Sequence, residues 1–154
     1  TENIDITTKF NEYFTSIPND IASKIPPSPK DPLDFIPEND FNFRLHTINP
    51  VVLINIVKKM ENKKSKDMFD ISNCLLKQII YGIAGPLSHI INQSLVTGQI
   101  PNQLKIAKVL PVFKLKGCAA SDKSDPNNYR PISLLNIFSK LLEKVISDQL
   151  TRFL

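Results

Sequence analysis

Prolines constrain the fold of this chain more than any other residue, because half of them fall in one short stretch. Six of the 12 prolines lie between positions 18 and 37. Each proline lacks a backbone N–H and fixes φ, so this density predicts an extended connector instead of a regular helix. The apolar residues from Ile6 to Ile17 recur at helical spacing and predict a short amphipathic helix that Pro18 ends. The main core must therefore come from the residues after the connector.

Helix signals dominate those residues. Asn49 and Pro50 provide a capping side chain followed by a first-turn proline, which predicts a helix start. Ser72 is a second predicted N-cap. Gly85–Pro86 is predicted to end that second helix and to begin a third, which Gly98 closes. The positions predicted to face the core are Val51, Ile54, Val57 and Met60, then Leu75, Leu76, Ile79, Ile80 and Ile83, then Leu87, Ile90, Ile91 and Leu95.

The pattern changes in the last third of the chain. Residues 106–114 are short, β-branched and partly alternating, which predicts a strand, and Pro111 places it at an edge or a bulge. Together with residues 129–134 it is expected to form a small β element. Residues 136–154 carry the clearest helical pattern, and we expect an exposed apolar face on residues 137–154. The predicted fold class is α/β and mostly helical.

Charge is divided unevenly along the sequence. The first 45 residues carry eight acidic and four basic side chains, a net charge of −4, whereas the remainder carries 15 basic and seven acidic side chains, a net charge of +8. Lysines concentrate at 58–66 and 105–116. A basic body suggests a polyanionic partner such as nucleic acid, although a solvated surface that keeps the protein in solution explains the same charge.

Several classes of protein are disfavoured by the residues. No apolar run reaches about 18 residues, so we predict no membrane span. The first residues lack a secretory signal, and the two cysteines, Cys74 and Cys118, are too few for a disulfide framework. We therefore expect an intracellular protein, in the nucleus or the cytoplasm, that is not secreted. Neither cysteine pairs with His46 or His89 at ligand spacing, so we predict no metal site.

A series of motifs is far more specific. It comprises KKSKDMFDIS at 63–72, IPNQLKIAKVLPVFK at 100–114, NNYRPISLL at 127–135 and KLLEK at 140–144. This order resembles the first conserved blocks of reverse transcriptases (RNA-directed DNA polymerases) from non-LTR retrotransposons, the LINE-type, Jockey-like elements. The resemblance covers roughly residues 47–154, whereas residues 1–46 are similar to the variable, proline-rich lead-in of such proteins. Two features depart from the family pattern: the loop after Lys114 is longer, and Asp70 stands where many relatives have Gly.

The resemblance implies the fingers and upstream part of a right-hand polymerase, truncated before the palm carboxylates. Reverse transcriptases hold two Mg²⁺ ions with palm carboxylates, some of them in a Tyr/Phe-x-Asp-Asp turn, and no such string occurs in this sequence. We therefore expect no catalytic residue here, Mg²⁺ only in the full-length enzyme, and no polymerisation by this chain without the missing palm domain. The implied partners are an RNA template, a DNA primer and a deoxynucleotide triphosphate, with no membrane.

The same resemblance assigns candidate site residues. Lys114 and Arg130 are the fingers residues that would grip the phosphates of the incoming nucleotide, and Lys63, Lys64 and Ser65 are candidates for template-backbone contact. Each has a simpler interpretation. Lys114 could end an edge strand in solvent, Arg130 could pair with a nearby aspartate of the loop (Asp122 or Asp125), and the lysines could form a solvated helix end that favours the helix dipole. Tyr129 is expected to pack instead of stacking on a base.

Three functional interpretations follow. The first is a fragment of an RNA-directed DNA polymerase that contributes template and nucleotide binding. The second is a non-catalytic nucleic-acid-binding or interaction module from a decayed mobile element, which would bind RNA with a strong salt dependence and no dependence on triphosphate. The third is a helical scaffold with no nucleic-acid role.

Overall fold

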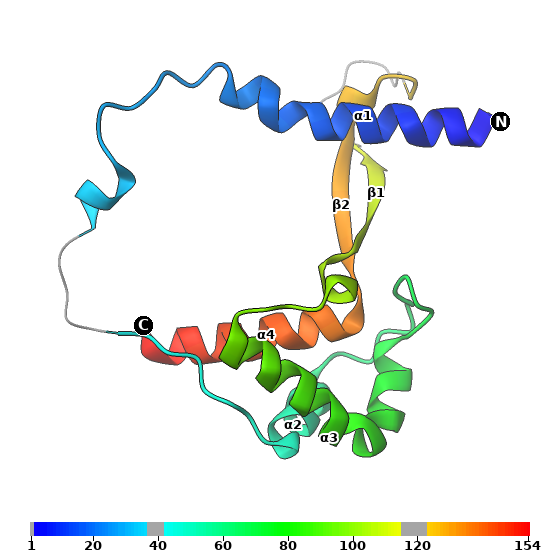
Figure 1. Ribbon diagram of the computed structural model, residues 1–154. Coiled ribbons are helices and arrows are strands. Elements are labelled where there is room, and N and C mark those ends of the chain that lie inside the picture. The colour runs from blue at the N-terminus through cyan, green and yellow to red at the C-terminus, as the bar shows by residue number, and fades with distance from the viewer. Residues whose placement is uncertain (1, 37–41, 115–122) are drawn as a thin grey trace. The chain divides into compact units, whose positions relative to one another are not determined.

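A computed structural model describes residues 2–36, 42–114 and 123–154 (Figure 1). The described chain is mostly helical with one two-stranded antiparallel sheet, which confirms the predicted mixture of helix and a small β element. It divides into two compact units, Thr1–Phe41 with Val109–Ile132 and Asn42–Lys108 with Ser133–Leu154. The elements are α1 Glu2–Ala22, η1 Pro32–Phe35, α2 Pro50–Lys59, α3 Asn73–Thr97, η2 Asn102–Lys105, β1 Ala107–Phe113, η3 Pro126–Asn128, β2 Tyr129–Leu135 and α4 Ile137–Phe153.

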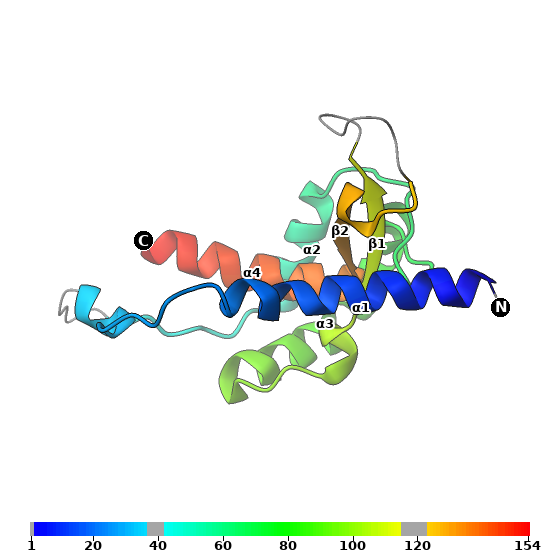
Figure 2. The same ribbon diagram turned by 90° about the horizontal axis from the view of Figure 1, so that it is seen from above.

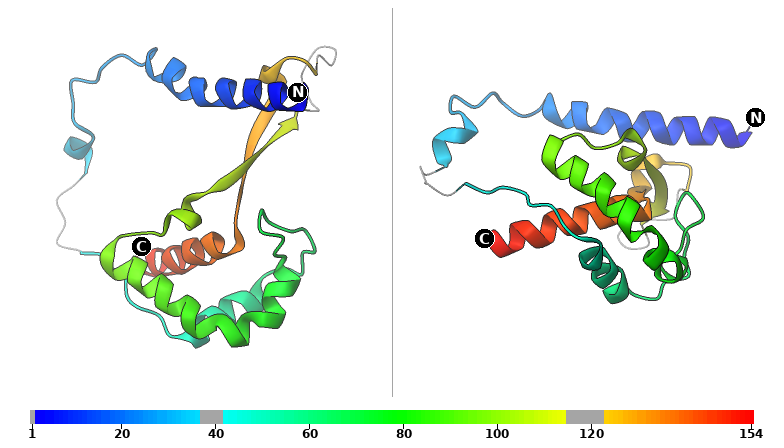
Figure 3. Two further views of the ribbon diagram at one scale, coloured as in Figure 1. Left: turned by 45° about the vertical axis from the view of Figure 1, so that its right-hand side comes forward. Right: turned by 60° about the horizontal axis from the view of Figure 1, so that its bottom comes forward.

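Helices α2, α3 and α4 pack around the core of the second unit (Figure 3). Asn49 and Ser72 cap α2 and α3 as predicted, and Gly98 ends α3 with a φ of 70°. Fewer residues of these helices are buried than the apolar stripes of the sequence predict. Val51 and Ile90, for example, were predicted to face the core and are 58% and 44% exposed. The buried apolar residues are Leu53 and Val57 of α2, Leu76, Ile80, Ala84, Leu87, Ile91 and Leu95 of α3, and Ile137, Leu141, Leu142 and Val145 of α4.

Helix α3 runs through Gly85–Pro86 without a break, so the predicted division into two helices is wrong. A proline inside a helix removes one backbone donor, and the hydroxyl of Ser88 donates to the Gly85 carbonyl at 2.8 Å in the affected turn. The continuous helix is long and apolar enough to cross a membrane by length and composition. The search for uninterrupted apolar runs in the sequence did not detect it. Its inward face forms the largest part of the core, as in the core helix of a globular domain.

Helix α1 likewise continues past Pro18 to Ala22, which corrects the predicted helix end (Figure 2). The hydroxyls of Thr15 and Ser16 donate to the carbonyls of Asn11 and Tyr13, at 2.7 and 2.9 Å, in the turns before the proline. The connector is also less extended than its prolines suggest, because residues 32–35 form η1. Asp31 caps this short helix and exchanges hydrogen bonds with Asp34 in a capping box.

The two strands form a ribbon that contributes residues to both units. Their bounds match the predicted segments to within one residue at each end. In a two-stranded sheet each strand has one edge without a partner strand. Pro111 can lie in β1 with its nitrogen at that open edge, where its missing N–H removes no hydrogen bond between the strands. Arg130 is a residue of β2, and Lys114 directly follows β1.

The N-terminal end of α4 is held by a buried polar network. Asn136 is fully buried, accepts the Ser139 N–H at 2.8 Å and donates to the Gln103 carbonyl at 3.1 Å. Asp67 accepts the first backbone N–H of α4, that of Ile137, at 2.8 Å. The expectation of an apolar face left exposed along this helix is wrong for its first turns, which supply four core residues, and holds only near its end, where Phe153 is 45% exposed.

The turn before α3 contains Asp70, the residue that departs from the family pattern described above. Asp70 has a φ of 61°, in the left-handed region that glycine adopts without strain. Its carboxylate lies 3.6 Å from the ammonium of Lys66, and this exposed ion pair is weak. The position therefore favours glycine.

We expect Asp70→Gly to raise the free energy of unfolding by about 0.5–1 kcal/mol, because it removes the strain of a side chain at positive φ. Asp70→Ala is the matched control, since it removes the same carboxylate and keeps a Cβ. Urea denaturation followed by circular dichroism measures both. Equal effects of the two variants would show that the ion pair with Lys66, and not the backbone, governs this position.

We expect Leu141→Ala to lower the free energy of unfolding by about 2–5 kcal/mol, because this side chain is 1% exposed in the centre of the core. Leu150→Ala, on the same helix but 39% exposed, should cost clearly less. Chemical denaturation of both variants measures the difference. Similar losses would contradict the packing of α4 described above.

Candidate functional site

Lys114 and Arg130 lie on the same face of the ribbon. The Lys114 N–H donates to the Asn128 carbonyl at 2.8 Å, which sets residue 113 opposite residue 129. The rings of Phe113 and Tyr129, 5.2 Å apart between centroids, show the same register. Side chains alternate along a strand, so Arg130 lies on the face opposite these two rings. The same alternation, continued one residue past the end of β1, puts Lys114 on that face as a diagonal neighbour of Arg130. The geometry allows both cations to converge on one anion.

The two cations differ in their present partners. The ammonium of Lys114 donates to the carbonyl of Asn127, and the side chain is half-buried. An ammonium has three donors, so this bond leaves two for an anion. Arg130 is exposed, and among the described residues it makes no hydrogen bond or ion pair. Asp125 instead accepts the backbone and side-chain N–H groups of Asn127, both at 2.9 Å, and Asp122 lies outside the described residues.

An aromatic cluster from α1 supports this part of the ribbon. The ring of Phe10 lies 4.8 Å from the ring of Tyr129 in an edge-on arrangement, and Phe14 stacks on Phe10 at 5.7 Å. Tyr13, from the same helix, donates a short hydrogen bond to the side-chain oxygen of Asn127. Tyr129 also donates to the Lys123 carbonyl at 2.9 Å, so it packs as expected. Helix α1 therefore holds both the strand that carries Arg130 and the residue that binds Lys114.

The candidate template-binding residues lie elsewhere, in the exposed loop after α2. Lys63 forms an ion pair with Glu61 at 2.9 Å. The hydrogen bond from Lys63 lowers the pKa of Glu61, and the same contact raises the pKa of Lys63. Lys64 and Ser65 are exposed beside it. These residues belong to the second unit, whereas Lys114 and Arg130 belong to the first.

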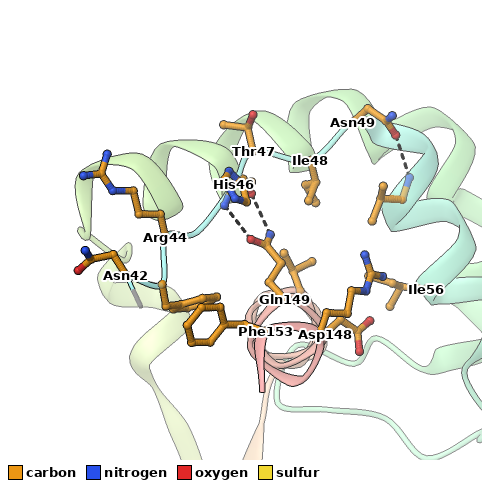
Figure 4. A pocket seen from close by; sticks show the side chains of 14 residues that line it. Asn42, Arg44, His46, Thr47, Ile48, Asn49, Ile56, Asp148, Gln149 and Phe153 are labelled. Atoms are coloured by element: carbon orange, nitrogen blue, oxygen red, sulfur yellow. Dashed lines mark hydrogen bonds between the residues drawn. The ribbon is translucent and has the colours of Figure 1, made fainter. Parts of the chain in front are cut away.

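A groove runs between α4 and the segment that leads into α2, and sequence reasoning missed it (Figure 4). It has a volume of about 570 Å³, and Gln149 crosses it by exchanging hydrogen bonds with the backbone of His46 at 2.7 and 2.8 Å. The rings of Phe43 and Phe153 meet at 5.3 Å at one end. Its walls come from positions about 100 residues apart, so no local sequence motif predicts it.

Carboxylates of the described residues do not form a metal centre. Groups of three or more His, Cys, Asp or Glu side chains that could hold an ion are absent from the described ranges. Asp67 uses one carboxylate oxygen to accept the backbone N–H groups of Phe69 and Ile71, and the other to accept that of Ile137. Cys74 is half-buried and free, and Cys118 lies outside the described residues. The carboxylate of Asp67 therefore serves to cap backbone N–H groups.

The supporting residues of α1 were also missed as part of the site. Their sequence signal was the aromatic residues Phe10, Tyr13 and Phe14, which recur at helical spacing. The contacts of this face, at Asn127 and Tyr129, are more than 100 positions further along the chain. Spacing along the sequence predicts which face of a helix is apolar, but not what covers it.

Comparison with known proteins gives a relative but no family assignment. Over 98 residues, 64% of this chain, the sequence is 32% identical to a protein of Drosophila melanogaster described as a probable RNA-directed DNA polymerase from transposon BS. The matched stretch spans 10% of the length of that protein. No family model matches the chain. The similarity supports a relationship to reverse transcriptases of transposons.

We expect Phe10→Ala to loosen the end of the ribbon, because it removes two aromatic contacts that are each worth about 0.5–1.5 kcal/mol. In hydrogen–deuterium exchange, amides of residues 129–132 should exchange faster, while those of α3 stay unchanged. Ile4→Ala, on the same helix but 70% exposed, is the control. Unchanged exchange at residues 129–132 in Phe10→Ala would refute the supporting role of α1.

Proposed function

We propose that this chain supplies the nucleotide-binding and template-binding fingers of an RNA-directed DNA polymerase from a LINE-type, Jockey-like non-LTR retrotransposon. The observation that carries the proposal is the pair of cations on one ribbon face, Lys114 and Arg130, within motifs that resemble this family. The similarity to the Drosophila transposon polymerase supports it at the level of the family. The activity belongs to the full-length protein, in the nucleus or the cytoplasm.

The chemistry of the pair fits a nucleoside triphosphate. The β- and γ-phosphate oxygens of a nucleotide carry most of its negative charge and need cations that neutralise them during phosphoryl transfer. A lysine supplies a mobile point charge, and an arginine supplies a planar fork that binds two oxygens at once. Arg130 has no competing partner among the described residues, and its strand is fixed by the packing of Tyr129.

Template contact is assigned to the loop of Lys63, Lys64 and Ser65. Contacts that do not depend on sequence are made mostly to phosphates, and these exposed cations and the hydroxyl suit that role. The ion pair with Glu61 reduces the charge that Lys63 offers, so Lys64 is the stronger candidate of the two. The template would be RNA and the growing primer DNA.

The two Mg²⁺ ions of such a reaction do not fit the described carboxylates. Asp67 is saturated by backbone N–H groups, and the described residues hold no cluster of acidic side chains. Because the sequence also contains no Tyr/Phe-x-Asp-Asp string, the proposal assigns the metal ions to palm carboxylates of the full-length protein. The role of the present chain is to bind and orient the triphosphate and the template.

We expect Arg130→Ala to weaken binding of a deoxynucleoside triphosphate by about 10- to 100-fold, because a charged hydrogen-bonding group is worth about 1.5–3 kcal/mol. Arg130→Lys should retain part of the affinity, since it keeps the charge and loses the fork. Isothermal titration calorimetry with dTTP measures both. Lys9→Ala, an exposed charge change in the same unit, is the control.

Triphosphate binding that Arg130→Ala leaves unchanged would contradict the assignment of the pair. RNA binding without any measurable binding of triphosphate would instead favour the non-catalytic module from a decayed element. A gel shift with RNA at low salt that shows no binding at all would favour the helical scaffold.

We expect no primer extension by the purified chain on an RNA template with Mg²⁺ and all four deoxynucleotides, because it lacks the palm carboxylates. The assay measures incorporation of a labelled nucleotide, with a complete reverse transcriptase as the positive control. Robust extension by this chain alone would show that the metal ligands lie within it and overturn the proposal for the palm.

A further inference from the structure

We infer that the groove between α2 and α4 is a second nucleic-acid site, which holds the sugar–phosphate backbone of a single strand. The α2–α4 groove is defined here as three adjoining depressions that share wall residues. Val52, Ile56 and Asp148 line the first and the second, and Ile56, Lys59 and Lys144 line the second and the third. The depressions therefore form one continuous path along α4.

The charge of this path is strongly positive. The cations that line it are Arg44, Lys59, Lys140, Lys144 and Arg152. Asp148 is the single acidic side chain among the described residues that line it, and it is already paired with Lys144 at 2.8 Å. All five cations are exposed. An evenly charged polyanion is the partner that complements such a surface.

The length of the cationic row suits a strand of several nucleotides. Lys140, Lys144 and Arg152 occupy one row along α4, at intervals of one and two turns, with the paired Asp148 between the last two. This row spans about 18 Å at 1.5 Å per residue. A stacked strand carries one phosphate per about 3.4 Å, so about five phosphates lie along that length. An acidic peptide that concentrates its charges at a few positions would leave part of the row unpaired.

This inference rests on the proposed function only in taking nucleic acid as the partner. The groove and the loop of Lys63 and Lys64 share no lining residue, and no residue of the ribbon tip lines the groove. The groove is therefore an additional contact that increases the length of strand bound by the second unit. It requires neither a triphosphate nor Mg²⁺.

The first test is the salt dependence of binding to a fluorescent 12-nucleotide single-stranded RNA, without triphosphate. Each phosphate contact contributes about 0.7 to the slope of log K against log salt for single strands, so Lys59→Gln/Lys140→Gln should lower the slope by about 1.4. Lys105→Gln/Lys108→Gln makes the same change of charge outside the groove and should leave the slope near the wild-type value. Equal slopes for the two double variants would overturn the inference.

The second test uses the wild-type chain, so it does not depend on how a variant folds. Acetylation of lysines by a water-soluble reagent, read by mass spectrometry, should be slowed by the RNA at Lys59, Lys140 and Lys144 and unchanged at Lys105 and Lys108. Absence of protection in the groove would refute the site. A poly-glutamate peptide that protects these three lysines as well as the RNA does would show a peptide site instead and equally refute the inference.

The two proposals fail separately. A triphosphate affinity that does not depend on Arg130 would refute the proposed fingers role and leave the groove experiments unaffected, because no triphosphate is present in them. Protection confined to Lys63 and Lys64 would support the loop as the template contact and refute the groove.

Discussion

The capped start of α4 is the interaction on which the second unit depends. Asn136 is fully buried, and a buried amide costs free energy unless its donors and acceptors are satisfied. It bonds to its own helix and to the Gln103 carbonyl, while Asp67 accepts the N–H of Ile137. The loop of Asp67, the short helix η2 and the start of α4 are thereby held together. The first turns of α4 can then pack their apolar side chains into the core that they share with α2 and α3.

Much of this unit could be predicted from sequence because its signals are local. The caps at Asn49 and Ser72 and the stop at Gly98 depend on a few neighbouring residues, and all three are confirmed. The helix break predicted at Gly85–Pro86 is wrong for the opposite reason. A proline inside a helix costs about 3 kcal/mol, which tertiary packing of a long helix outweighs, and no local pattern reports that packing.

The candidate site likewise contains residues that could be assigned from the sequence and residues that could not. The positions of Lys114 and Arg130 were assigned from the resemblance to a family, and the alternation of side chains explains how two such positions come to share one face. The residues that support them could not be predicted, since Phe10 and Tyr13 act on positions more than 100 residues away. The α2–α4 groove has walls from equally distant segments, so its positive charge becomes visible only when α4 is placed beside α2.

The long sequence separation between α1 and its aromatic contacts also affects folding during synthesis. During synthesis, the helix emerges from the ribosome long before Tyr129, and a loop of more than 100 residues must close before the two rings can meet. The rings of Phe10 and Phe14 therefore lack this neighbour until Tyr129 has been synthesised. Such a face is a natural binding site for chaperones and a hazard for association between nascent chains.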